Sequence, residues 1–327
     1  MFSVPRSQLF HILYRVLYTE HMSVPQTYPT TVAVVGLGNM GMPMARHLLG
    51  AARETGGTLI VHARNRDKVS ALLHDGAEWA DDPAGLASAS VVLSVLPDIP
   101  QLEAMLWGDH GIIQAVTAPT VLLIASTSAP SLVRELAARA ASESSGLVSV
   151  VDCPVSGGVE GAQNAELAIM VGGDAASVSS AMPVLERLGT PVHLGPLGSG
   201  QVAKACNQAI VAATVLALGE AAVLADRSGL DVRALFELLG RGYASSRILE
   251  TRGDRIVDRD YRVAGPARYM VKDLGFALDE ARRTDTVLPQ TEALLAAFTA
   301  LVDRGYGDDD IAVTRAFVES LSERPLD

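Results

Sequence analysis

A glycine-rich turn near the N-terminus constrains the fold of this chain more than any other feature. Residues 31–35 read Thr-Val-Ala-Val-Val, a β-branched run typical of a buried parallel strand. The turn Gly36-Leu37-Gly38-Asn39-Met40-Gly41 follows, and a helical pattern of apolar residues begins at Pro43. A strand, a G-x-G-x-x-G turn and a helix in this order predict a dinucleotide-binding Rossmann unit.

Each glycine of this turn has its own task. Gly36 permits the tight bend, Gly38 lets a pyrophosphate approach the backbone, and Gly41 lets the helix pack closely on the strand. The N–H groups at the start of the helix then face the phosphates. We therefore expect residues 36–41 to bind the cofactor. The alternative is a glycine turn with a structural role only.

The end of the second predicted strand, Thr58–His62, indicates which dinucleotide is bound. An NAD site should show Asp or Glu about 20 residues after the glycines, to hold the ribose hydroxyls. This chain instead reads Ala63-Arg64-Asn65-Arg66 there. Because a guanidinium binds a phosphate through two N–H groups, we predict a preference for NADP(H), with NAD(H) possible and Arg64 as the main contact. The alternative is that these charges are solvated loop residues.

Further strands are predicted at residues 91–96, 121–125, 147–152, 167–171 and 192–194. In an open α/β sheet, the loops after the strands line the ligand crevice, which makes Leu96, Pro97 and Thr127 candidate cofactor contacts. After the strand that ends at residue 152 comes Ser156-Gly157-Gly158. A hydroxyl beside exposed backbone N–H groups suits a carboxylate, although an ordinary glycine turn has the same pattern.

From residue 195 onward the pattern becomes helical. A long apolar helix is predicted at residues 202–226, followed by helices near 232–239, 245–259, 269–283, 291–304 and 309–322. We therefore predict a doubly wound, mostly parallel α/β Rossmann domain (29–194). A long helix joins it to an all-helical domain (195–327), and residues 1–28 form an extension that is disordered or loosely docked.

Lys204 is the candidate for proton transfer. The chain has only three lysines (Lys68, Lys204 and Lys272) among 26 Lys and Arg residues. Arginine stays protonated, whereas a desolvated lysine can lose its proton and act as general acid or base. Gln201, Asn207 and Gln208 lie on the same helical face as Lys204, and such a polar face on an apolar helix is costly unless something polar docks there. The alternative is a lysine that reaches solvent from the start of the helix.

The charge balance limits the partners. With 37 acids against 26 bases the net charge is −11, which argues against a general affinity for nucleic acid or for an anionic membrane. Cys153 and Cys206 lie far apart and fit no metal or redox spacing, so we expect no metal and a reducing compartment, the cytoplasm. Residues 9–18 are apolar but too short to span a membrane. We expect translation to start at Met22 or the segment to be an extension, although Arg6 and Arg15 hint at an organelle transit peptide.

Four segments in order resemble the signatures of the β-hydroxyacid dehydrogenases, which include 3-hydroxyisobutyrate dehydrogenase, tartronate semialdehyde reductase and glyoxylate/succinic semialdehyde reductase. The segments are residues 36–41, Asp152-Cys153-Pro154-Val155-Ser156-Gly157-Gly158, residues 198–208, and Lys272-Asp273-Leu274. The resemblance runs from about Thr31 to about Phe317. Four ordered motifs make it far more specific than any single one.

The resemblance implies a Rossmann domain, a long helix and a 6-phosphogluconate dehydrogenase-like helical domain that mediates homodimer or homotetramer contacts. It implies that Lys204 is the catalytic acid and base, that Ser156, Gly157 and Gly158 bind the substrate carboxylate, and that Thr127 and Lys272 contact the cofactor. It also assigns substrate positioning to Asn207 and Gln208. The family often has Asn where Gln208 stands, so which amide touches substrate stays open.

The implied activity is reversible hydride transfer between a nicotinamide cofactor and a short, carboxylate-bearing β-hydroxyacid or its semialdehyde. Two rivals are an imine reductase-like NADPH enzyme, which typically lacks the lysine, and a non-catalytic NADPH-binding module, in which the lysine or the Ser-Gly-Gly site would be degraded. Both features are intact in this chain.

Overall fold

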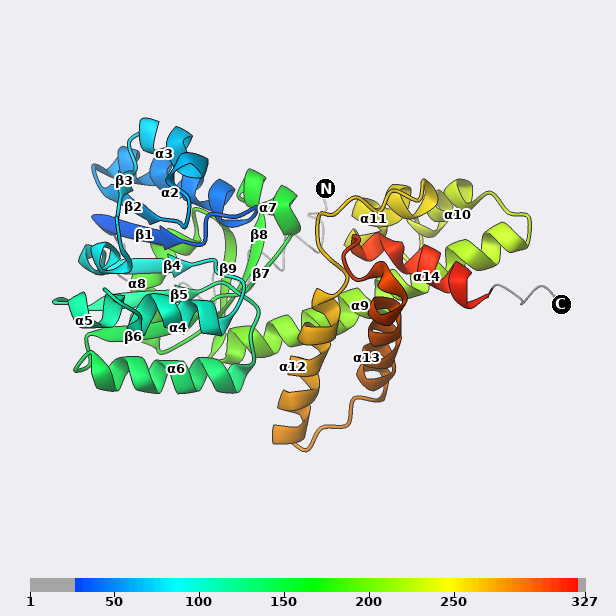
Figure 1. The fold of residues 1–327 in the computed structure, drawn as a ribbon. Helices are drawn as coiled ribbons and strands as arrows, with labels where there is room; N and C mark the ends of the chain where they lie inside the picture. The colour runs from blue at the N-terminus through cyan, green and yellow to red at the C-terminus, as the bar shows by residue number, and fades with distance from the viewer. Residues whose placement is uncertain (1–26, 323–327) are drawn as a thin grey trace, which may run out of the picture.

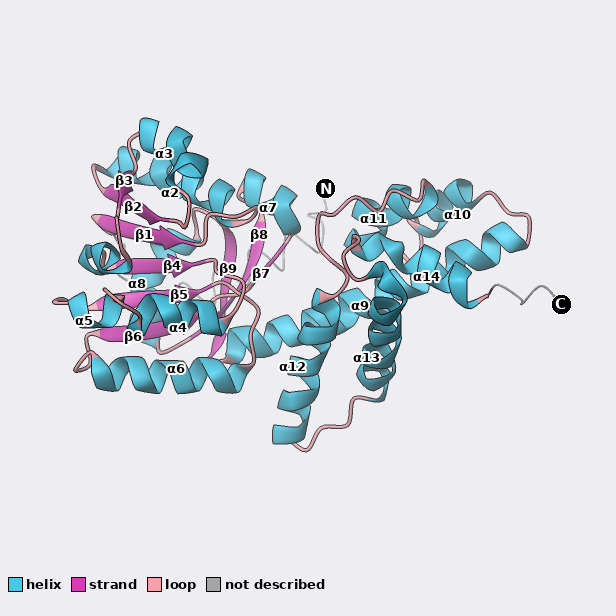
Figure 2. Ribbon diagram, in the orientation of Figure 1, coloured by secondary structure: helices cyan, strands magenta, loops and turns pink. Residues whose placement is uncertain are grey.

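The computed structural model describes residues 27–322, which form two parts of different architecture joined by one long helix (Figure 1). The strands lie in the N-terminal part, and the C-terminal part is helical (Figure 2). Helix α9 (Ser199–Arg227) begins against the sheet and continues into the helical part. The predicted fold class is therefore confirmed. Our interpretation of residues 1–26 lies outside the described residues.

The sheet has the strand order of a doubly wound dinucleotide fold, β3-β2-β1-β4-β5-β6, extended by β8 and β7, with β9 beside β8. Strands β1 to β6 pair in parallel, whereas β8 is antiparallel to both β6 and β7. The strands are β1 (Thr31–Val35), β2 (Thr58–His62), β3 (Glu78–Trp79), β4 (Val91–Ser94), β5 (Thr120–Ile124), β6 (Val148–Asp152), β7 (Val155–Ser156), β8 (Leu167–Gly172) and β9 (Gly189–Gly195).

Helices cover both faces of the sheet, because successive side chains of a strand point to opposite faces. Val32 and Val34 of β1 join one buried cluster, under α2 and α8, while Ala33 and Val35 join the other, under α4 and α6. The helices of this part are α2 (Gly41–Thr55), α3 (Ser70–His74), α4 (Ile99–Trp107), α5 (Ile112–Ala115), α6 (Pro130–Glu143), α7 (Gly158–Asn164) and α8 (Ala175–Leu185), with 3-10 turns η1 (Arg66–Val69) and η2 (Pro83–Ser88).

The helical part packs around the later turns of α9. Ala212, Val215 and Leu218 of α9 are buried in a third cluster with Phe298 and Phe317. By length and composition α9 could span a membrane, but a single such helix is weak evidence for a span, and 44% of its most apolar window is buried inside the structure. The other helices are α10 (Val232–Leu239), α11 (Arg247–Val257), α12 (Tyr269–Arg283), α13 (Pro289–Leu301) and α14 (Thr314–Leu321), with the π turn η3 (Val302–Tyr306) and the 3-10 turn η4 (Ile311–Val313).

Some predicted boundaries were wrong. The helix expected at 291–304 ends as α13 at Leu301, and the chain then turns through Gly305, which has a φ of 88°. The helix expected at 309–322 is a 3-10 turn capped by Asp310 and a shorter α14. Helix α11 starts two residues later than expected because the Ser246 hydroxyl accepts the N–H of Leu249. The two-residue strands β3 and β7 were not predicted.

Candidate active site

The glycine turn between β1 and α2 has the shape that a dinucleotide requires. A Cβ on Gly36 would lie 2.5 Å from the carbonyl carbon of Val95, and one on Gly41 would lie 2.1 Å from the Gly36 oxygen. A Cβ on Gly38 would meet nothing within 4 Å. Helix α2 has no side-chain cap, because its N-cap residue is Met40. The turn therefore leaves open space in front of uncapped helical N–H groups, which fits a pyrophosphate. Leu37 and Asn39 complete this turn.

Arg64 lies just after β2 and is exposed, with no ion pair among the described residues. The nearby Arg66 is held differently, since its guanidinium lies 5.5 Å from the centre of the Trp79 ring, which also stacks on His62. Arg64 is thus the guanidinium that is available to an incoming phosphate at this strand end.

The carboxyl ends of β4 and β5 continue the same edge of the sheet. After β4, Leu96 is half-buried and Pro97 is exposed. After β5, the Thr127 carbonyl accepts a 3.2 Å hydrogen bond from Nζ of Lys272 on α12. Because parallel strands end at one edge, Arg64, the glycine turn, Leu96 and Thr127 follow one another along it in the order β2, β1, β4, β5.

Ser156 and Gly157 lie where β7 passes into α7. Ser156 pairs with Ala168 of β8, and its residue is half-buried. Gly157 has a φ of 130° and Gly158 a φ of 63°, conformations that favour glycine. Both glycines are exposed, and a Cβ on Gly158 would meet open space. The backbone of this turn is therefore accessible to a ligand.

Lys204 lies on the second turn of α9 and is 8% exposed. Burial lowers the pKa of its amine to about 8, Asp273 works in the opposite direction, and Lys272 lowers the pKa further. None of the described residues forms a hydrogen bond or an ion pair with Nζ. Such an amine is desolvated and uncommitted, as a proton-transfer group should be.

The two amides after Lys204 form a network around Asp273. Gln208 Nε2 donates to Asp273 Oδ2 at 2.7 Å, and Gln208 Oε1 accepts from Asn207 Nδ2 at 2.9 Å. Asp273 Oδ1 accepts from Lys272 Nζ at 2.9 Å. Both ends of the Gln208 amide are thus occupied, whereas Asn207 is half-buried and its Oδ1 has no hydrogen-bond donor among the described residues.

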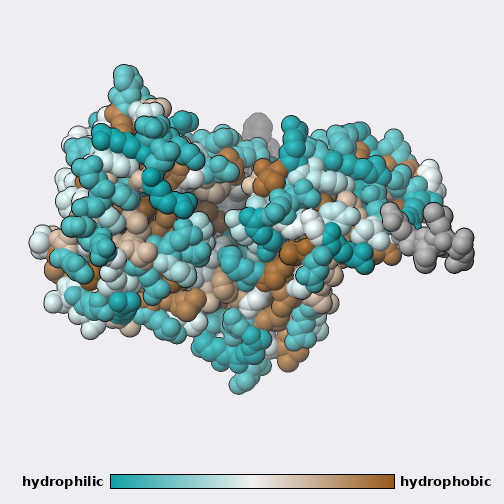
Figure 3. Space-filling view, viewed as in Figure 1, coloured by the Kyte–Doolittle hydropathy of each residue, from teal (hydrophilic) through white to brown (hydrophobic). Residues whose placement is uncertain are grey.

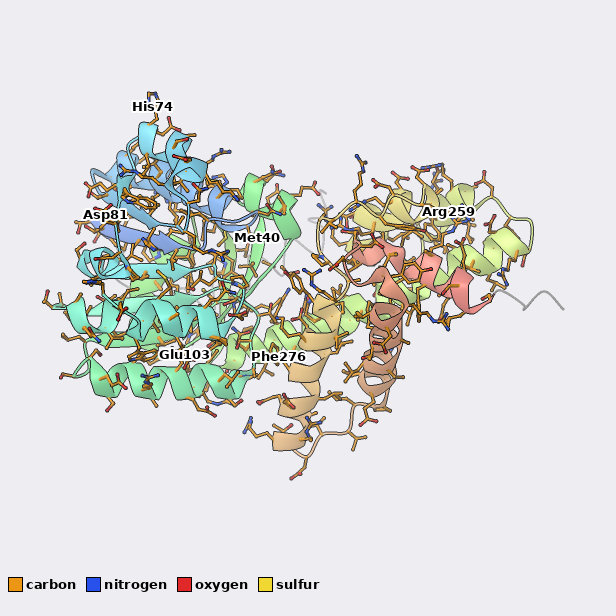
Figure 4. The ribbon with its side chains drawn as sticks, in the orientation of Figure 1. Met40, His74, Asp81, Glu103, Arg259 and Phe276 are labelled. Carbon is orange, nitrogen blue, oxygen red and sulfur yellow. The ribbon has the colours of Figure 1, made fainter. Side chains whose placement is uncertain are left out.

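The predicted site residues fall into three groups, of which one is the turn at Ser156, Gly157 and Gly158 between β7 and α7. Lys204, Asn207, Gln208, Lys272 and Thr127 meet where α9 and α12 approach the sheet. The glycine turn, Arg64, Leu96 and Pro97 lie further along the carboxyl edge. Met40 and Phe276 lie on the facing sides of the two parts (Figure 4).

Sequence reasoning gave no role to Asp152 and Asp273, although Asp152 opens one signature segment and Asp273 is the middle residue of another. It placed Gln201 on the lysine face without a task. In the structure Gln201 Nε2 donates to the Ser126 carbonyl and Gln201 Oε1 accepts from the N–H of Ser128, which holds the loop that carries Thr127. Within residues 27–322 no cluster of three His, Cys, Asp or Glu side chains could hold a metal ion.

Comparison with known families gives two consecutive matches. Residues 31–198 match the NAD binding domain of 6-phosphogluconate dehydrogenase. Residues 198–317 match the family described as NAD-binding of NADP-dependent 3-hydroxyisobutyrate dehydrogenase. The two matches meet at the start of α9.

Individual relatives agree with these matches. An Arabidopsis thaliana protein named "Probable 3-hydroxyisobutyrate dehydrogenase-like 3, mitochondrial" is 35% identical over 315 residues, 94% of each chain. The NAD-dependent L-serine dehydrogenase of Pseudomonas aeruginosa is 34% identical over 293 residues, 87% of this chain and 96% of the relative. Among solved structures, 3-hydroxyisobutyrate dehydrogenase from Salmonella typhimurium has a TM-score of 0.78 at 26% identity, covering 88% of this chain and 99% of that one.

Proposed function

The chain belongs to the 3-hydroxyisobutyrate dehydrogenase family of NAD(P)-dependent β-hydroxyacid dehydrogenases, and from this premise we propose that it reduces a short carboxylate-bearing semialdehyde with NADPH, reversibly, with Lys204 as general acid and base. The observation that carries this proposal is the Lys204 amine, which is buried, has no hydrogen-bond partner among the described residues and has a pKa of about 8. An amine of this kind populates both protonation states near neutral pH.

Lys204 exchanges one proton with the substrate oxygen. When bound, the nicotinamide supplies or accepts the hydride. In reduction, Lys204 Nζ donates its proton to the carbonyl oxygen, and in oxidation the neutral amine takes the hydroxyl proton. Because Asp273 and Lys272 lie beside Lys204 with opposite charges, they adjust the proton affinity of Nζ without contacting the reacting carbon.

We assign the substrate carboxylate to the turn at Ser156. The Ser156 hydroxyl and the backbone N–H groups of Gly157 and Gly158 are donors of the kind that binds a carboxylate, and the turn is accessible. Such anchoring fixes which substrate carbon faces the cofactor. Since Gln208 uses both ends of its amide on neighbours, Asn207 is the amide with an oxygen left for the substrate hydroxyl.

The preference for NADP(H) is part of the proposal. It is supported by the exposed Arg64 and by the absence of an acidic residue at the end of β2. The Pseudomonas relative is named as NAD-dependent, so the family alone does not decide the cofactor. The turn at residues 36–41 fits the pyrophosphate shared by both dinucleotides.

Two further statements accompany the proposal. Within residues 27–322, nine of the eleven exposed large apolar side chains (all except Leu132 and Leu194) belong to residues from Ile210 onward. Apolar residues gather over α12 and α13 (Figure 3). A homodimer or homotetramer formed through the helical part would cover them.

The compartment is proposed as cytoplasmic because Cys153 and Cys206 are unpaired. The Arabidopsis relative is named mitochondrial. Fractionation of cells that express the full chain tests the compartment.

The deciding experiment is a substrate panel. The full chain is assayed for reduction of glyoxylate, succinic semialdehyde, tartronate semialdehyde and methylmalonate semialdehyde with NADPH and with NADH, and for oxidation of L-serine with both oxidised cofactors. Turnover of at least one compound with a preference for the phosphorylated cofactor is expected. Turnover with NAD(H) alone would refute the role of Arg64 but not that of Lys204. Tight NADPH binding without any turnover would refute the catalytic proposal.

A further inference from the structure

Asp152 is a buried carboxylate to which the proposed chemistry gives no task. It ends β6, is fully buried, and has no cationic partner among the described residues. Its oxygens accept instead from the backbone of the first turn of α9, with the Gly198 N–H 2.7 Å from Oδ1 and the Gln201 N–H 2.7 Å from Oδ2. Burial raises the pKa of Asp152 to about 6, while the backbone N–H groups act to lower it.

The Asp152 carboxylate is tightly packed against two glycines. Asp152 stands opposite Gly172 of β8, and a Cβ on Gly172 would lie 2.4 Å from Asp152 Oδ1. A Cβ on Gly200 would lie 2.2 Å from the Met170 carbonyl and 2.8 Å from Asp152 Oδ2. Only glycines let the start of α9 lie directly on β8, with the carboxylate between the helix and the end of β6.

The hydrogen bonds between Asp152 and the start of α9 join the two segments that carry the proposed substrate site. From Asp152 the chain runs four residues to Ser156, which begins the carboxylate turn. From Gln201, whose N–H the carboxylate accepts, one helical turn leads to Lys204. The segment that carries Ser156 and the helix that carries Lys204 are therefore linked by two hydrogen bonds to the Asp152 side chain.

Resting on the proposed function, we propose that Asp152 is a positioning residue, which sets the distance between the Lys204 amine and the carboxylate turn at Ser156. Its hydrogen bonds fix the position of the α9 start relative to β6, and so fix where the proton donor stands relative to the anchored substrate. A misplacement of about 1 Å in such a pair costs on the order of 100-fold in rate. Asp152 contacts neither substrate nor cofactor in this role.

The test compares two changes at Asp152 with a matched control. Asp152→Asn keeps the size but turns one acceptor into an amide donor that faces a backbone N–H. Asp152→Glu keeps the charge and adds a methylene. The control is Asp174→Ala, because Asp174 caps α8, another helix of the same domain, by accepting the N–H groups of Ala176 and Ser177, and alanine removes this cap. The Tm, the Kd for NADPH, kcat, KM and the deuterium isotope effect with 4-deuterated NADPH are measured on each full-length protein.

Both Asp152 variants are expected to lose about 10- to 100-fold in kcat, with the NADPH Kd within about threefold and a larger isotope effect, because hydride transfer becomes slower than the other steps. Asp174→Ala should lower the Tm through the loss of its cap and leave kcat and the isotope effect unchanged. If Asp152 had only a structural role as the cap of α9, its variants would contain less active protein, but their isotope effect would equal that of the wild type. Wild-type kcat and isotope effect in either Asp152 variant would overturn the proposal.

A second variant covers the case in which Asp152→Asn does not fold. Gly172→Ala keeps the Asp152 side chain, but its Cβ would lie 2.4 Å from Asp152 Oδ1 and 2.8 Å from the backbone nitrogens of Ser199 and Gly200, so it displaces the carboxylate and the start of α9 from each other. The same loss of kcat with a raised isotope effect is expected. Unchanged kcat and isotope effect in folded Gly172→Ala would overturn the proposal. Lys204→Ala is run in parallel: if it keeps wild-type turnover, the proposed function fails. If it is inactive while the Asp152 variants are fully active, only the role of Asp152 fails.

Discussion

At the scale of single residues, the chemistry depends on the charges around Lys204 Nζ. Burial lowers its pKa to about 8, and the two charged neighbours that act on it, Asp273 and Lys272, come from consecutive positions of α12. The Asp273 carboxylate is itself held by Lys272 and Gln208. Removing the acid and removing the base should therefore shift the pKa of Lys204 in opposite directions.

Replacing Lys204 should remove most turnover. Lys204→Ala is expected to lower kcat by about 10²- to 10⁴-fold, the range that general acid–base catalysis contributes. Lys204→Arg should be nearly as slow, because a guanidinium keeps its proton. NADPH titration followed by fluorescence should show a Kd close to that of the wild type in both. Retained turnover in Lys204→Arg would contradict the acid–base role.

The pH dependence follows from the same amine. Reduction needs protonated Lys204, so its rate should fall as the pH rises through about 8, and oxidation needs the neutral amine, so its rate should rise there. Asp273→Asn should move both inflections to lower pH, and Lys272→Met should move them to higher pH. The profiles are measured at saturating cofactor, since Lys272 is also a proposed cofactor contact. Shifts of both variants in one direction would contradict the assignment.

Arg64 should act on one cofactor only. Arg64→Gln is expected to raise the KM for NADPH by about 10- to 100-fold, the loss of charge-assisted hydrogen bonds to a phosphate, and to leave the KM for NADH unchanged. Arg66→Gln is the matched control, because that guanidinium lies over Trp79. An equal effect of Arg64→Gln on both cofactors would remove the 2′-phosphate interpretation.

At the scale of elements, the turn between β1 and α2 separates two uses of glycine. Gly36 and Gly41 are required by neighbouring backbone, since a Cβ on either would overlap main-chain atoms. Gly38 borders open space and has no such neighbour. The fold needs Gly36 and Gly41, whereas Gly38 is needed only for the proposed approach of the cofactor.

A pair of alanine substitutions tests this division. Gly38→Ala should leave the Tm of the protein without cofactor within about 2 °C of the wild type, as an exposed substitution should, while weakening NADPH binding. Gly41→Ala should lower the Tm of the cofactor-free protein, because the helix must move away from the Gly36 carbonyl. Thermal melts with and without NADPH distinguish the two. A Gly38→Ala protein with wild-type affinity would contradict phosphate binding at this turn.

At the scale of the whole molecule, the helical part exposes apolar side chains that a single chain does not cover. Ile210 and Leu224 of α9 are 68% and 71% exposed. They lie 14 residues apart, nearly four helical turns, and so share one face of α9. A second copy of the chain is the proposed cover for this face.

Light scattering after gel filtration checks this proposal. We expect a mass two or four times that of the chain. Leu224→Arg places a charge on the shared face and should shift the mass toward that of the monomer. Leu194→Arg, at an exposed position of the N-terminal part, is the control and should not change the mass. A monomeric wild type would refute the oligomer.

The sequence alone determined the fold class, most elements and the candidate residues. The ranges of β1, β2, α10 and α12 agree with the predicted ones because periodicity and local turn residues fix them within a short stretch of chain. The roles of Lys204 and the other predicted site residues remain predictions. The short strands β3 and β7 had no periodicity to detect, and the end of α13 depended on the backbone angles of Gly305.

Only the tertiary structure decided which polar groups meet. Nothing in the sequence places Asp152 on the N–H groups of Gly198 and Gln201, 46 and 49 residues away, or Lys272 on the carbonyl of Thr127. The sequence also left open whether Asn207 or Gln208 faces the substrate. The hydrogen bond from Gln208 to Asp273 favours Asn207, because it occupies the Gln208 amide. Local pattern determines a helix or a strand, whereas the pairing of buried donors and acceptors depends on how separate elements pack, and so becomes visible only in the folded chain.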